Sequence, residues 1–382
     1  MTGKAWSLKT LKIAYITQEE ILGPSYTGGI QCCKRNLSLL KQAFGDDSIY
    51  TCAITKNKAY LDKAAGNTTV FFSDRSKAGI LRNVLQGRLQ FGMDTEKSVL
   101  QHISSLGCNT AFLDSSRMGT LQKKLPKEIK QILFMLNIEK DYIKNLIRVH
   151  PTRTVLKRAF EGNESLAVEY ADKVISLNNR DAGQLIKYYG RSPDCIIPIT
   201  MDDSFAPLNE VKEKITSTKL QLLFIGSFFA SNEHGVTWFV NEVMPHVNAE
   251  FIIVGRDFEK LSQKLNRSNV KVIGTVDDLS GYYHDADAIV SPILVGDGMK
   301  VKTAEALMYG KPMFATDEAL EGYCVEDQEN IFRCNTKEQF IVVINKYALK
   351  EERTGFDSKL RNLFLEKHHT PRYISVMKGL LQ

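Results

Sequence analysis

The stretch GDGMKVKTAEALMYGKP, residues 296–312, places glycines, an aspartate, two lysines and a glutamate directly after an apolar run. The apolar run, residues 286–292, predicts a strand, and residues 299–309 predict a helix that ends at a glycine and a proline. A helix start presents free backbone N–H groups and a partial positive charge. Because Lys300 and Lys302 add full charges there, the stretch predicts a binding site for a diphosphate.

Two acidic residues lie in the same stretch, eight positions apart. Glu305 lies one turn into the helix, where a carboxylate could accept hydrogen bonds from sugar hydroxyls, and Asp297 lies in the loop. Lys300 and Lys302 are two positions apart, so on a helix they would point to different sides. The residues alone leave a purely structural alternative open. Lys302 and Glu305 would then be a surface pair three positions apart, and Asp297 a turn residue.

A glycine pair near the N-terminus has similar properties. Gly28 and Gly29 follow the first apolar run and open a segment with helical spacing of apolar residues. Glycines at a helix start let backbone N–H groups approach an anion or a sugar closely, although a tight turn would use the same pair. The spacing is not that of the GxGxxG dinucleotide fingerprint, which disfavours an NAD-dependent dehydrogenase.

The bulk composition limits the class of protein. The 382 residues exceed what one hydrophobic core usually fills, so two domains are expected. A net charge of +6 suits phosphorylated ligands or an anionic membrane surface, but it does not indicate a nucleic-acid partner. Seven cysteines without regular spacing indicate reduced thiols. No apolar run approaches the ~20 residues of a membrane span, so we expect a cytoplasmic protein, at most peripheral at the inner face of a membrane.

Short apolar runs alternate with helical patterns from end to end, which predicts an α/β fold with mostly parallel sheets. The runs are residues 11–17, 49–55, 68–72, 109–114, 131–136 and 173–177 in the first half, and 220–226, 249–255, 270–274, 286–292 and 312–316 in the second. Prolines and polar residues around 198–216 interrupt this rhythm. We therefore expect two doubly wound domains facing a central cleft, with ligands beyond the carboxyl ends of the strands.

The second half resembles the C-terminal half of family 4 retaining glycosyltransferases (glycosyl transferases group 1), which have the GT-B architecture of two Rossmann-like domains. Ordered matches extend over roughly residues 220–325. Asp297 and Glu305 match the two acidic residues of the family motif, with Asp297 in place of a glutamate. The other matches in this motif are Gly296, Gly298, Lys300, Lys302, Gly310, Pro312, Thr316 and Gly322.

The first half carries weaker similarity to the same family. Its glycine loop, which faces the donor phosphate and the acceptor, corresponds to Gly28 and Gly29. Asn137, Glu139 and Tyr142 match a further family segment at a strand end, in which Leu136 takes the usual histidine position. The resemblance implies that these residues lie on the acceptor side.

The basic pair that follows the first strand of the family's C-terminal domain is replaced here by Ser227 and Asn232. Lys300 and Lys302 are the expected substitutes, with Arg256 as a further possibility. By the resemblance, the donor-binding residues would be Gly226, Ser227, Asn232, Arg256, Gly296, Gly298, Met299 and Val301.

The resemblance implies transfer of a sugar, with retention, from a nucleotide-sugar, a UDP-sugar being favoured, to a glycan, lipid-linked or protein-linked hydroxyl. Glu305 would hold the ribose, Asp297 the donor sugar, and the helix start with its lysines the leaving diphosphate. We expect no metal or other cofactor, because no DxD motif follows a suitable strand. The expected domains are 1–197 for the acceptor, 198–365 for the nucleotide-sugar, and a C-terminal helix, 366–382, that returns to the first domain.

Two other functions remain open. A catalytically silent GT-B relative could stabilise a partner transferase, consistent with the replacements at Asp297, Ser227 and Leu136. A nucleotide-sugar 2-epimerase would need carboxylates and histidines across the cleft, and the histidine positions show no such arrangement. The segment Ser73–Gly92, which mixes basic and apolar residues, would either rest on an anionic membrane or form a surface helix with a buried apolar face.

Overall fold

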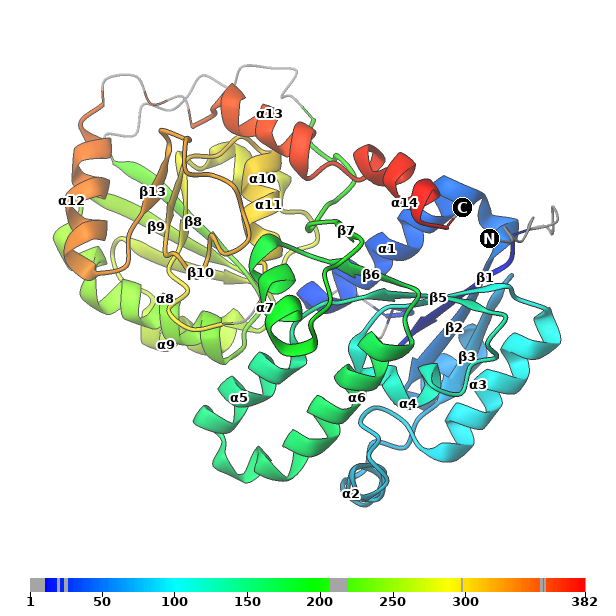
Figure 1. The fold of residues 1–382 in the computed structure, drawn as a ribbon. Coiled ribbons are helices and arrows are strands. Elements are labelled where there is room, and N and C mark those ends of the chain that lie inside the picture. Colours follow the sequence, from blue (N-terminus) through cyan, green and yellow to red (C-terminus); the bar gives the residue numbers. More distant parts are fainter. Residues whose placement is uncertain are drawn as a thin grey trace. The chain divides into compact units, whose positions relative to one another are not determined.

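The structure is a computed structural model, and it describes residues 11–18, 21–23, 27–206, 219–296, 298–350, 353 and 355–381. The chain divides into two compact units (Figure 1). The first unit comprises Met1–Ile197 together with Thr370–Gln382, and the second comprises Pro198–His369. The return to the first unit thus falls at residue 370, where the sequence predicts residue 366. Residues 207–216 of the expected boundary lie outside the described residues.

In its described part, the first unit contains a seven-stranded parallel sheet in the order β3-β2-β1-β4-β5-β6-β7. The strands are β1 (Ile13–Thr17), β2 (Ile49–Thr55), β3 (Thr68–Phe72), β4 (Thr110–Leu113), β5 (Lys130–Phe134), β6 (Lys173–Ser176) and β7 (Cys195–Ile196). Every residue of β1 is buried, because this central strand is covered on both faces.

Helices connect most of the successive strands of this unit, and a 3-10 turn at Lys58–Lys63 connects β2 to β3 (Figure 1). They are α1 (Gly28–Phe44), α2 (Lys77–Leu85), α3 (Met93–Leu106), α4 (Gly119–Gln122), α5 (Glu139–Val149), α6 (Lys157–Tyr170), α7 (Asn179–Tyr189) and, at the C-terminus, α14 (Ile374–Leu381). The helix α14 packs against α1, so the end of the chain completes the layer of helices over the first sheet.

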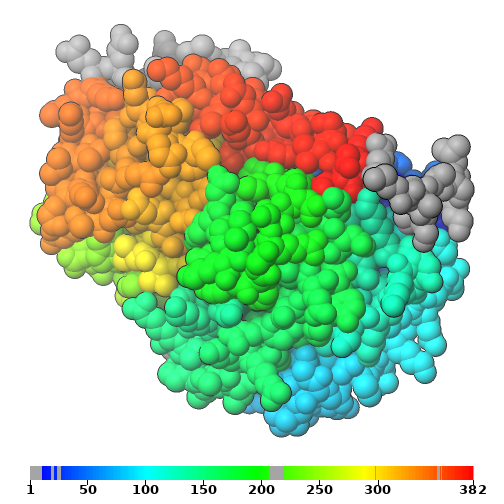
Figure 2. Space-filling view, in the orientation of Figure 1, coloured from blue at the N-terminus to red at the C-terminus, as the bar shows by residue number. Residues whose placement is uncertain are grey.

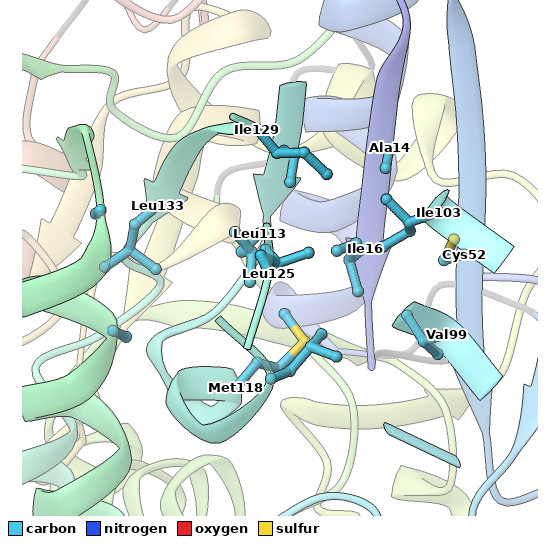
Figure 3. Close-up of a cluster of buried hydrophobic side chains, with 14 of the residues drawn as sticks. Ala14, Ile16, Cys52, Val99, Ile103, Leu113, Met118, Leu125, Ile129 and Leu133 are labelled. Atoms are coloured by element: carbon cyan, nitrogen blue, oxygen red, sulfur yellow. The ribbon is translucent and has the colours of Figure 1, made fainter. Parts of the chain in front are cut away.

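One hydrophobic core of the first unit lies between its sheet and α3 (Figure 3). Ala14 and Ile16 of β1 point toward Val99 and Ile103 of α3, and all four side chains are fully buried. Burial of such side chains stabilises the fold by roughly 1.5–3 kcal/mol for each large one. This core fixes β1 and β4, the two strands whose carboxyl ends flank the reversal of strand order.

The second unit, over its described ranges, holds a six-stranded parallel sheet in the order β10-β9-β8-β11-β12-β13. Its strands are β8 (Leu220–Ile225), β9 (Ala249–Val254), β10 (Val270–Gly274), β11 (Ala288–Ser291), β12 (Met313–Ala315) and β13 (Ile331–Arg333). Its helices are α8 (Ala230–Glu242), α9 (Ser262–Leu265), α10 (Ser280–Asp285), α11 (Val301–Met308), α12 (Lys337–Ala348) and α13 (Ser358–Lys367).

Both sheets confirm the predicted α/β fold with two doubly wound sheets. In each sheet the chain runs outward in one direction and then starts again on the other side of the first strand, between β1 and β4 and between β8 and β11. Ligands of such sheets bind beyond the carboxyl ends of the strands at this reversal. The sequence did not indicate β7 and β13, because runs of two and three residues are too short to show a pattern.

The expected buried apolar face of Ser73–Gly92 is wrong. The side chains of Leu81 and Leu85 on α2 are 60% and 79% exposed. The helix instead approaches the preceding loop through Gly79, where an added Cβ would lie 2.6 Å from the Asp74 carbonyl oxygen. A short helix that packs through a glycine leaves its larger apolar residues in solvent.

Candidate functional site

The loop after β11 leads into α11 at the reversal of strand order in the second sheet. The helix α11 begins at Val301, so Lys300 precedes it with an extended backbone, and Lys302 lies in its first turn. The sequence predicts a helix start at residue 299, which would have placed both lysines on the helix. Asp297 lies outside the described residues.

Lys302 is held by neutral groups. Its Nζ donates to Asn232 Oδ1 at 2.7 Å and lies 4.4 Å from the centre of the Phe224 ring. Asn232 is buried, and its Nδ2 donates to the Ser227 carbonyl oxygen at 2.7 Å. Among the described residues no carboxylate forms an ion pair with Lys302. An amide and an aromatic ring therefore fix the position of this ammonium group without neutralising its charge.

The surroundings of Lys302 weaken its hold on a proton. Burial lowers the pKa of Lys302 to about 7, and the nearby charge of Lys300 acts in the same direction, while Glu305 opposes it. Burial penalises the charged form because few water molecules remain to solvate it. An anion that enters the site would supply the missing charge and raise this pKa again.

Lys300 has a different role from Lys302. Its Nζ donates to Glu318 Oε1 and to the Gly298 carbonyl oxygen, both at 2.6 Å. Tyr323 Oη donates to the Lys300 carbonyl oxygen at 2.7 Å. The charge of Lys300 is thus already compensated, and its contacts hold the loop before α11 in one conformation. Gly298 adopts a φ of 67°, which other residues rarely tolerate.

Glu305 lies one turn along α11, beside two stacked tyrosines. Tyr283 Oη donates to Glu305 Oε2 at 3.2 Å, and the rings of Tyr283 and Tyr309 are parallel with centres 4.3 Å apart. Burial raises the pKa of Glu305, while the hydrogen bond from Tyr283 and the charge of Lys302 lower it. The carboxylate is therefore oriented by a fixed donor, and it lies close enough to Lys302 for the two charges to interact.

The loop between β8 and α8 forms the opposite wall. An added methyl group at Gly226 would lie 2.9 Å from Asn232 Nδ2 and 3.0 Å from Lys302 Nζ. At Gly235, an added Cβ would meet the Pro292 carbonyl oxygen at 2.0 Å. Gly235 requires glycine because backbone approaches it, and it brings α8 against the loop that follows β11, whereas a larger residue at Gly226 would displace the ends of the Asn232 and Lys302 side chains.

The remaining predicted donor-side residues lie at the same edge of the sheet. Arg256 follows β9, and its carbonyl oxygen accepts from the Phe228 N–H at 2.8 Å. The side chain of Met299 is buried, and Val301 is the first residue of α11. An added Cβ at Gly296 would lie 3.1 Å from Glu318 Oε1. The structure thus places the described residues of the predicted donor side in the loops that follow β8, β9 and β11, in α8 and at the start of α11.

The predicted acceptor-side residues lie in the first unit. Gly28 and Gly29 begin α1, whose N-cap is the residue before them. Asn137 precedes α5. Glu139 is 1% exposed, and its Oε1 accepts from Arg117 Nε at 2.8 Å. These residues follow β1 and β5, which are separated in the sheet by β4.

Arg117 joins two of these positions. Its guanidinium lies 4.9 Å from the centre of the Tyr142 ring, and its Nε contacts Glu139. Both predicted side chains are thus part of one packed ion-pair cluster. The other predicted acceptor-side residues differ from these two: Asn137 has a short polar side chain, and Gly28 and Gly29 have none.

Sequence reasoning missed Tyr283 and Glu318, which orient Glu305 and Lys300. Glu318 had a usable signal, since it follows the next strand along the sheet, β12, and the carboxyl ends of parallel strands share one edge. Tyr283 carried no signal, because it lies in the short helix α10 before β11 rather than after a strand.

Two other kinds of site are absent from the described ranges. No group of three or more His, Cys, Asp or Glu side chains there could hold a metal ion. None of the helices described is both long enough and apolar enough to cross a membrane.

Comparisons with known proteins agree with this geometry. Residues 219–347 match the model of the family described as Glycosyl transferases group 1. No curated protein matches the chain.

Solved structures resemble the whole chain. A sucrose-phosphate synthase from Thermosynechococcus elongatus is 14% identical, with a TM-score of 0.73, covering 97% of this chain and 98% of its own. HepE from Anabaena in complex with UDP-glucose is 14% identical, with a TM-score of 0.67 and coverage of 97% and 99%. A variant of TarM from S. aureus with Fondaparinux, alpha-GlcNAc-glycerol and UDP is 12% identical, with a TM-score of 0.66 and coverage of 97% and 100%.

At these identities the structural matches show the fold, which is that of the GT-B glycosyltransferases. The match to the family model lies on the second unit, where the lysines and Glu305 are found. The chain is a glycosyltransferase, and its second unit carries a glycosyl transferases group 1 domain. The expectation of an enzyme is confirmed at this level.

Proposed function

We propose that the chain transfers a sugar from a nucleotide-sugar, preferably a UDP-sugar, to a hydroxyl group of a glycan acceptor, with retention at the anomeric carbon. The observation that carries the proposal is the ammonium group of Lys302, which lies at the carboxyl edge of the second sheet. It is held by Asn232 and Phe224, and no carboxylate of the described chain pairs with it. A site of this kind is suited to a diphosphate.

The family resemblance adds support at one particular pair of positions. It places a lysine where this chain has Asn232, and here Lys302 Nζ lies 2.7 Å from the side chain of that residue. The family motif also has a lysine at the position of Lys302, so this chain keeps the lysine of α11 and lacks the one of α8, and the retained ammonium group lies beside the altered position. The retained charge favours a working diphosphate site over a silent relative that has lost it.

The chemistry follows from charge. As the bond between the anomeric carbon and the diphosphate breaks, negative charge grows on the leaving phosphate. Lys302 and the backbone N–H groups at the start of α11 stabilise that charge most strongly in the transition state. Glu305 would accept hydrogen bonds from the ribose, and Asp297 would contact the donor sugar. Fixed positive groups would take the part that a divalent ion plays in other transferases.

The preference for uridine rests on two of the similar structures, HepE with UDP-glucose and TarM with UDP. The acceptor would be a hydroxyl of a glycan, free, lipid-linked or protein-linked, in polysaccharide or glycoprotein assembly. Gly28, Gly29 and Asn137 would lie on its side. We place the reaction in the cytoplasm, with the exposed Leu81 and Leu85 of α2 available for contact with a membrane surface.

A thermal-shift screen of the full chain against UDP, GDP, ADP and their sugars tests the proposal. At about 100 times its Kd, a ligand should stabilise the chain by roughly 2.7 kcal/mol and raise Tm by a few degrees. The stabilising nucleotide-sugar is then tested for transfer or hydrolysis.

Glu305→Ala should abolish this activity while the fold stays intact, and Glu366→Ala, at an exposed glutamate of α13, serves as the control. A chain that no nucleotide or nucleotide-sugar stabilises would contradict the proposal. A chain that binds a nucleotide-sugar without turning it over would favour the silent relative.

A further inference from the structure

A pocket lies in the first unit, whereas the residues assigned above to the donor belong to the second unit. It has a volume of about 720 Å³ and is formed by α5, a 3-10 turn at Pro151–Leu156, α6 and α7. The residues that line it include Lys140, Lys157, Arg158, Glu161, Gly162, Tyr188 and Tyr189. The volume is within the range of small-molecule sites. In Figure 2 the segments that form it, coloured teal to green, lie at the surface on the face shown.

The charge of the pocket is positive. Lys140, Lys157 and Arg158 line it, against a single acidic residue, Glu161. Lys157 Nζ lies 3.9 Å from Glu161 Oε1, so one cation is partly compensated by the helix itself. Arg158 is exposed and has no hydrogen bond or ion pair with any residue that the structure describes. The pocket therefore offers a guanidinium and an ammonium group to an anionic ligand.

The hydroxyl groups of the two tyrosines that line the pocket are already hydrogen-bonded within the protein. Tyr188 Oη donates to Asp141 Oδ1 and Tyr189 Oη donates to Glu164 Oε2, each at 2.7 Å. A ligand can therefore contact only the rings of these two side chains, and ring surface suits the C–H face of a sugar ring. Lys140 Nζ lies 4.5 Å from the centre of the Tyr188 ring, so a cation adjoins that surface.

The pocket is preformed, because one buried side chain ties its walls together. Glu164 of α6 is fully buried, and its carboxylate accepts from the backbone N–H groups of Glu139 at 2.6 Å and Lys140 at 3.1 Å, as well as from Tyr189. This carboxylate thus links α5, α6 and α7. A ligand would not have to order these walls on binding, which reduces the entropic cost.

We propose that this pocket binds an acidic saccharide, whose negative group contacts Arg158 and Lys140 and whose sugar ring packs on Tyr188 and Tyr189. The inference rests on the proposed function in taking a glycan as the ligand, and it adds that the acceptor chain carries negative charge. Cations next to aromatic rings distinguish such a ligand from a neutral glycan, which would gain only the ring contacts, and from a free anion, which would gain only the charges.

The test compares pentagalacturonate with maltopentaose, a neutral oligosaccharide of equal length, by titration calorimetry on the full chain. We expect pentagalacturonate to bind at least about tenfold more tightly, which corresponds to the usual worth of a few charge-assisted contacts. Arg158→Glu should lower its affinity about tenfold or more. The control is Lys97→Glu, an equal change of charge at an exposed lysine of α3.

A second series tests the pocket by its volume instead of its charge. An added Cβ at Gly162 would meet nothing within 4 Å, so larger side chains there project into open space. Gly162→Phe should reduce binding of pentagalacturonate strongly, and Gly162→Ala much less. Since both changes keep α6 intact, loss of the fold would not explain a graded effect.

Other outcomes would overturn the inference. Equal affinity for the two oligosaccharides, or equal loss with Lys97→Glu and Arg158→Glu, would mean that no acidic saccharide is recognised here. Displacement of pentagalacturonate by an equal concentration of inorganic phosphate would reduce the pocket to a simple anion site. Binding of vesicles rich in phosphatidylglycerol, but not of pentagalacturonate, would assign the surface to lipid headgroups. The UDP thermal shift, measured on the same variants, reports separately on the proposed function.

Discussion

The reversal points of the two sheets contain charges of opposite sign, one fully buried and one partly buried, and the surrounding residues treat them differently. Asp114, which follows β4 of the first sheet, is fully buried and accepts from Tyr15 Oη and, at 2.5 Å, from Asn36 Nδ2. Lys302, beside β8 and β11 of the second sheet, is held by one neutral amide, that of Asn232, and an aromatic ring. The Asp114 carboxylate receives its hydrogen bonds from neighbouring side chains, whereas the Lys302 ammonium is held in position without a counter-charge, which a bound ligand could supply.

This difference separates a charge that serves stability from one that serves binding. A buried ion that is fully hydrogen-bonded contributes to the fold, and removing it leaves its donors without partners. A buried ion without a counter-charge costs stability and is retained where a ligand supplies that charge. Deleting the two charges should therefore change the free energy of unfolding in opposite directions.

The largest effect is expected for Asp114→Ala. Asn36 would lose its acceptor within the core and Tyr15 one of two, the other being the Cys33 carbonyl oxygen at 2.6 Å, so the free energy of unfolding of the first unit should fall by about 3–5 kcal/mol. Urea denaturation, with the unfolding of each unit monitored separately, would measure this loss of stability. Asp114→Asn is the matched control and should lose less, about 1–2 kcal/mol, because it keeps the volume and one acceptor. An unchanged midpoint in both variants would show that the network does not support the fold.

Next in size is the effect of Lys302→Met on nucleotide binding. Removing the one ammonium that is fixed at the diphosphate site should weaken UDP by roughly 2–4 kcal/mol, about 30- to 1000-fold. Stability without ligand should stay equal or rise, because an uncompensated buried charge has been removed. Titration calorimetry and a thermal melt on one preparation check both results.

Lys264→Met, at an exposed lysine of α9, is the control for Lys302→Met and should leave the affinity for UDP unchanged. Two results would argue against a binding role for Lys302: a clear loss of stability in Lys302→Met, or UDP affinity equal to that of the unaltered chain. Either result would mean that Lys302, like Asp114, does not serve ligand binding, and the two reversal points would then no longer differ in this respect.

A smaller effect is expected from pH, and its sign differs between binding and stability. With a pKa of about 7, Lys302 is largely neutral at pH 8–9, so UDP binding must take up a proton and should weaken as pH rises. The unfolded chain has the ordinary lysine pKa, about 10.4, and binds more protons between these values. Through this residue, the free energy of unfolding should therefore rise with pH from about 7 to 10.

Calorimetry in buffers of different ionisation enthalpy measures the proton uptake directly. At pH 8 we expect somewhat less than one proton per UDP bound, and a fall in affinity of up to about tenfold per pH unit above 7. Lys302→Met should abolish this linkage. The absence of any proton uptake in the unaltered chain would mean that Lys302 is already fully charged before the ligand arrives.

The candidate donor site of the second unit could be predicted from the sequence where its residues directly follow strands. Lys300, Lys302 and Glu305 come directly after an apolar run and at a helix start, so elementary rules place them at the edge of a parallel sheet. The partners that make the two lysines different could not be predicted. Asn232 of α8 and Glu318, which follows β12, reach them from 70 and 18 residues away in the chain, and only packing decides such contacts.

The contacts at the strand ends of the first unit were harder to predict from the sequence. Glu139 matches a family segment, but the sequence does not reveal that Arg117, which precedes it by 22 residues, pairs with it in the structure. Nor does the sequence indicate that Asp114 is satisfied by Tyr15 and Asn36. A polar residue at a strand end looks the same whether its partners are internal or external. The difference between the two reversal points therefore became visible only in the structure.

The smallest effect should come from Tyr283→Phe, which tests whether Glu305 is positioned by its neighbour. The hydroxyl donates to Glu305 Oε2 at 3.2 Å, and its loss leaves ring stacking with Tyr309 in place. The carboxylate should become less well oriented toward the ribose, with a cost of about 1 kcal/mol or roughly fivefold in UDP affinity. The comparison that decides is uridine against its 2′-deoxy analogue. If Glu305 binds the ribose, the preference for the ribose form should shrink in Tyr283→Phe and vanish in Glu305→Ala, and a preference unchanged in both variants would remove Glu305 from the donor site.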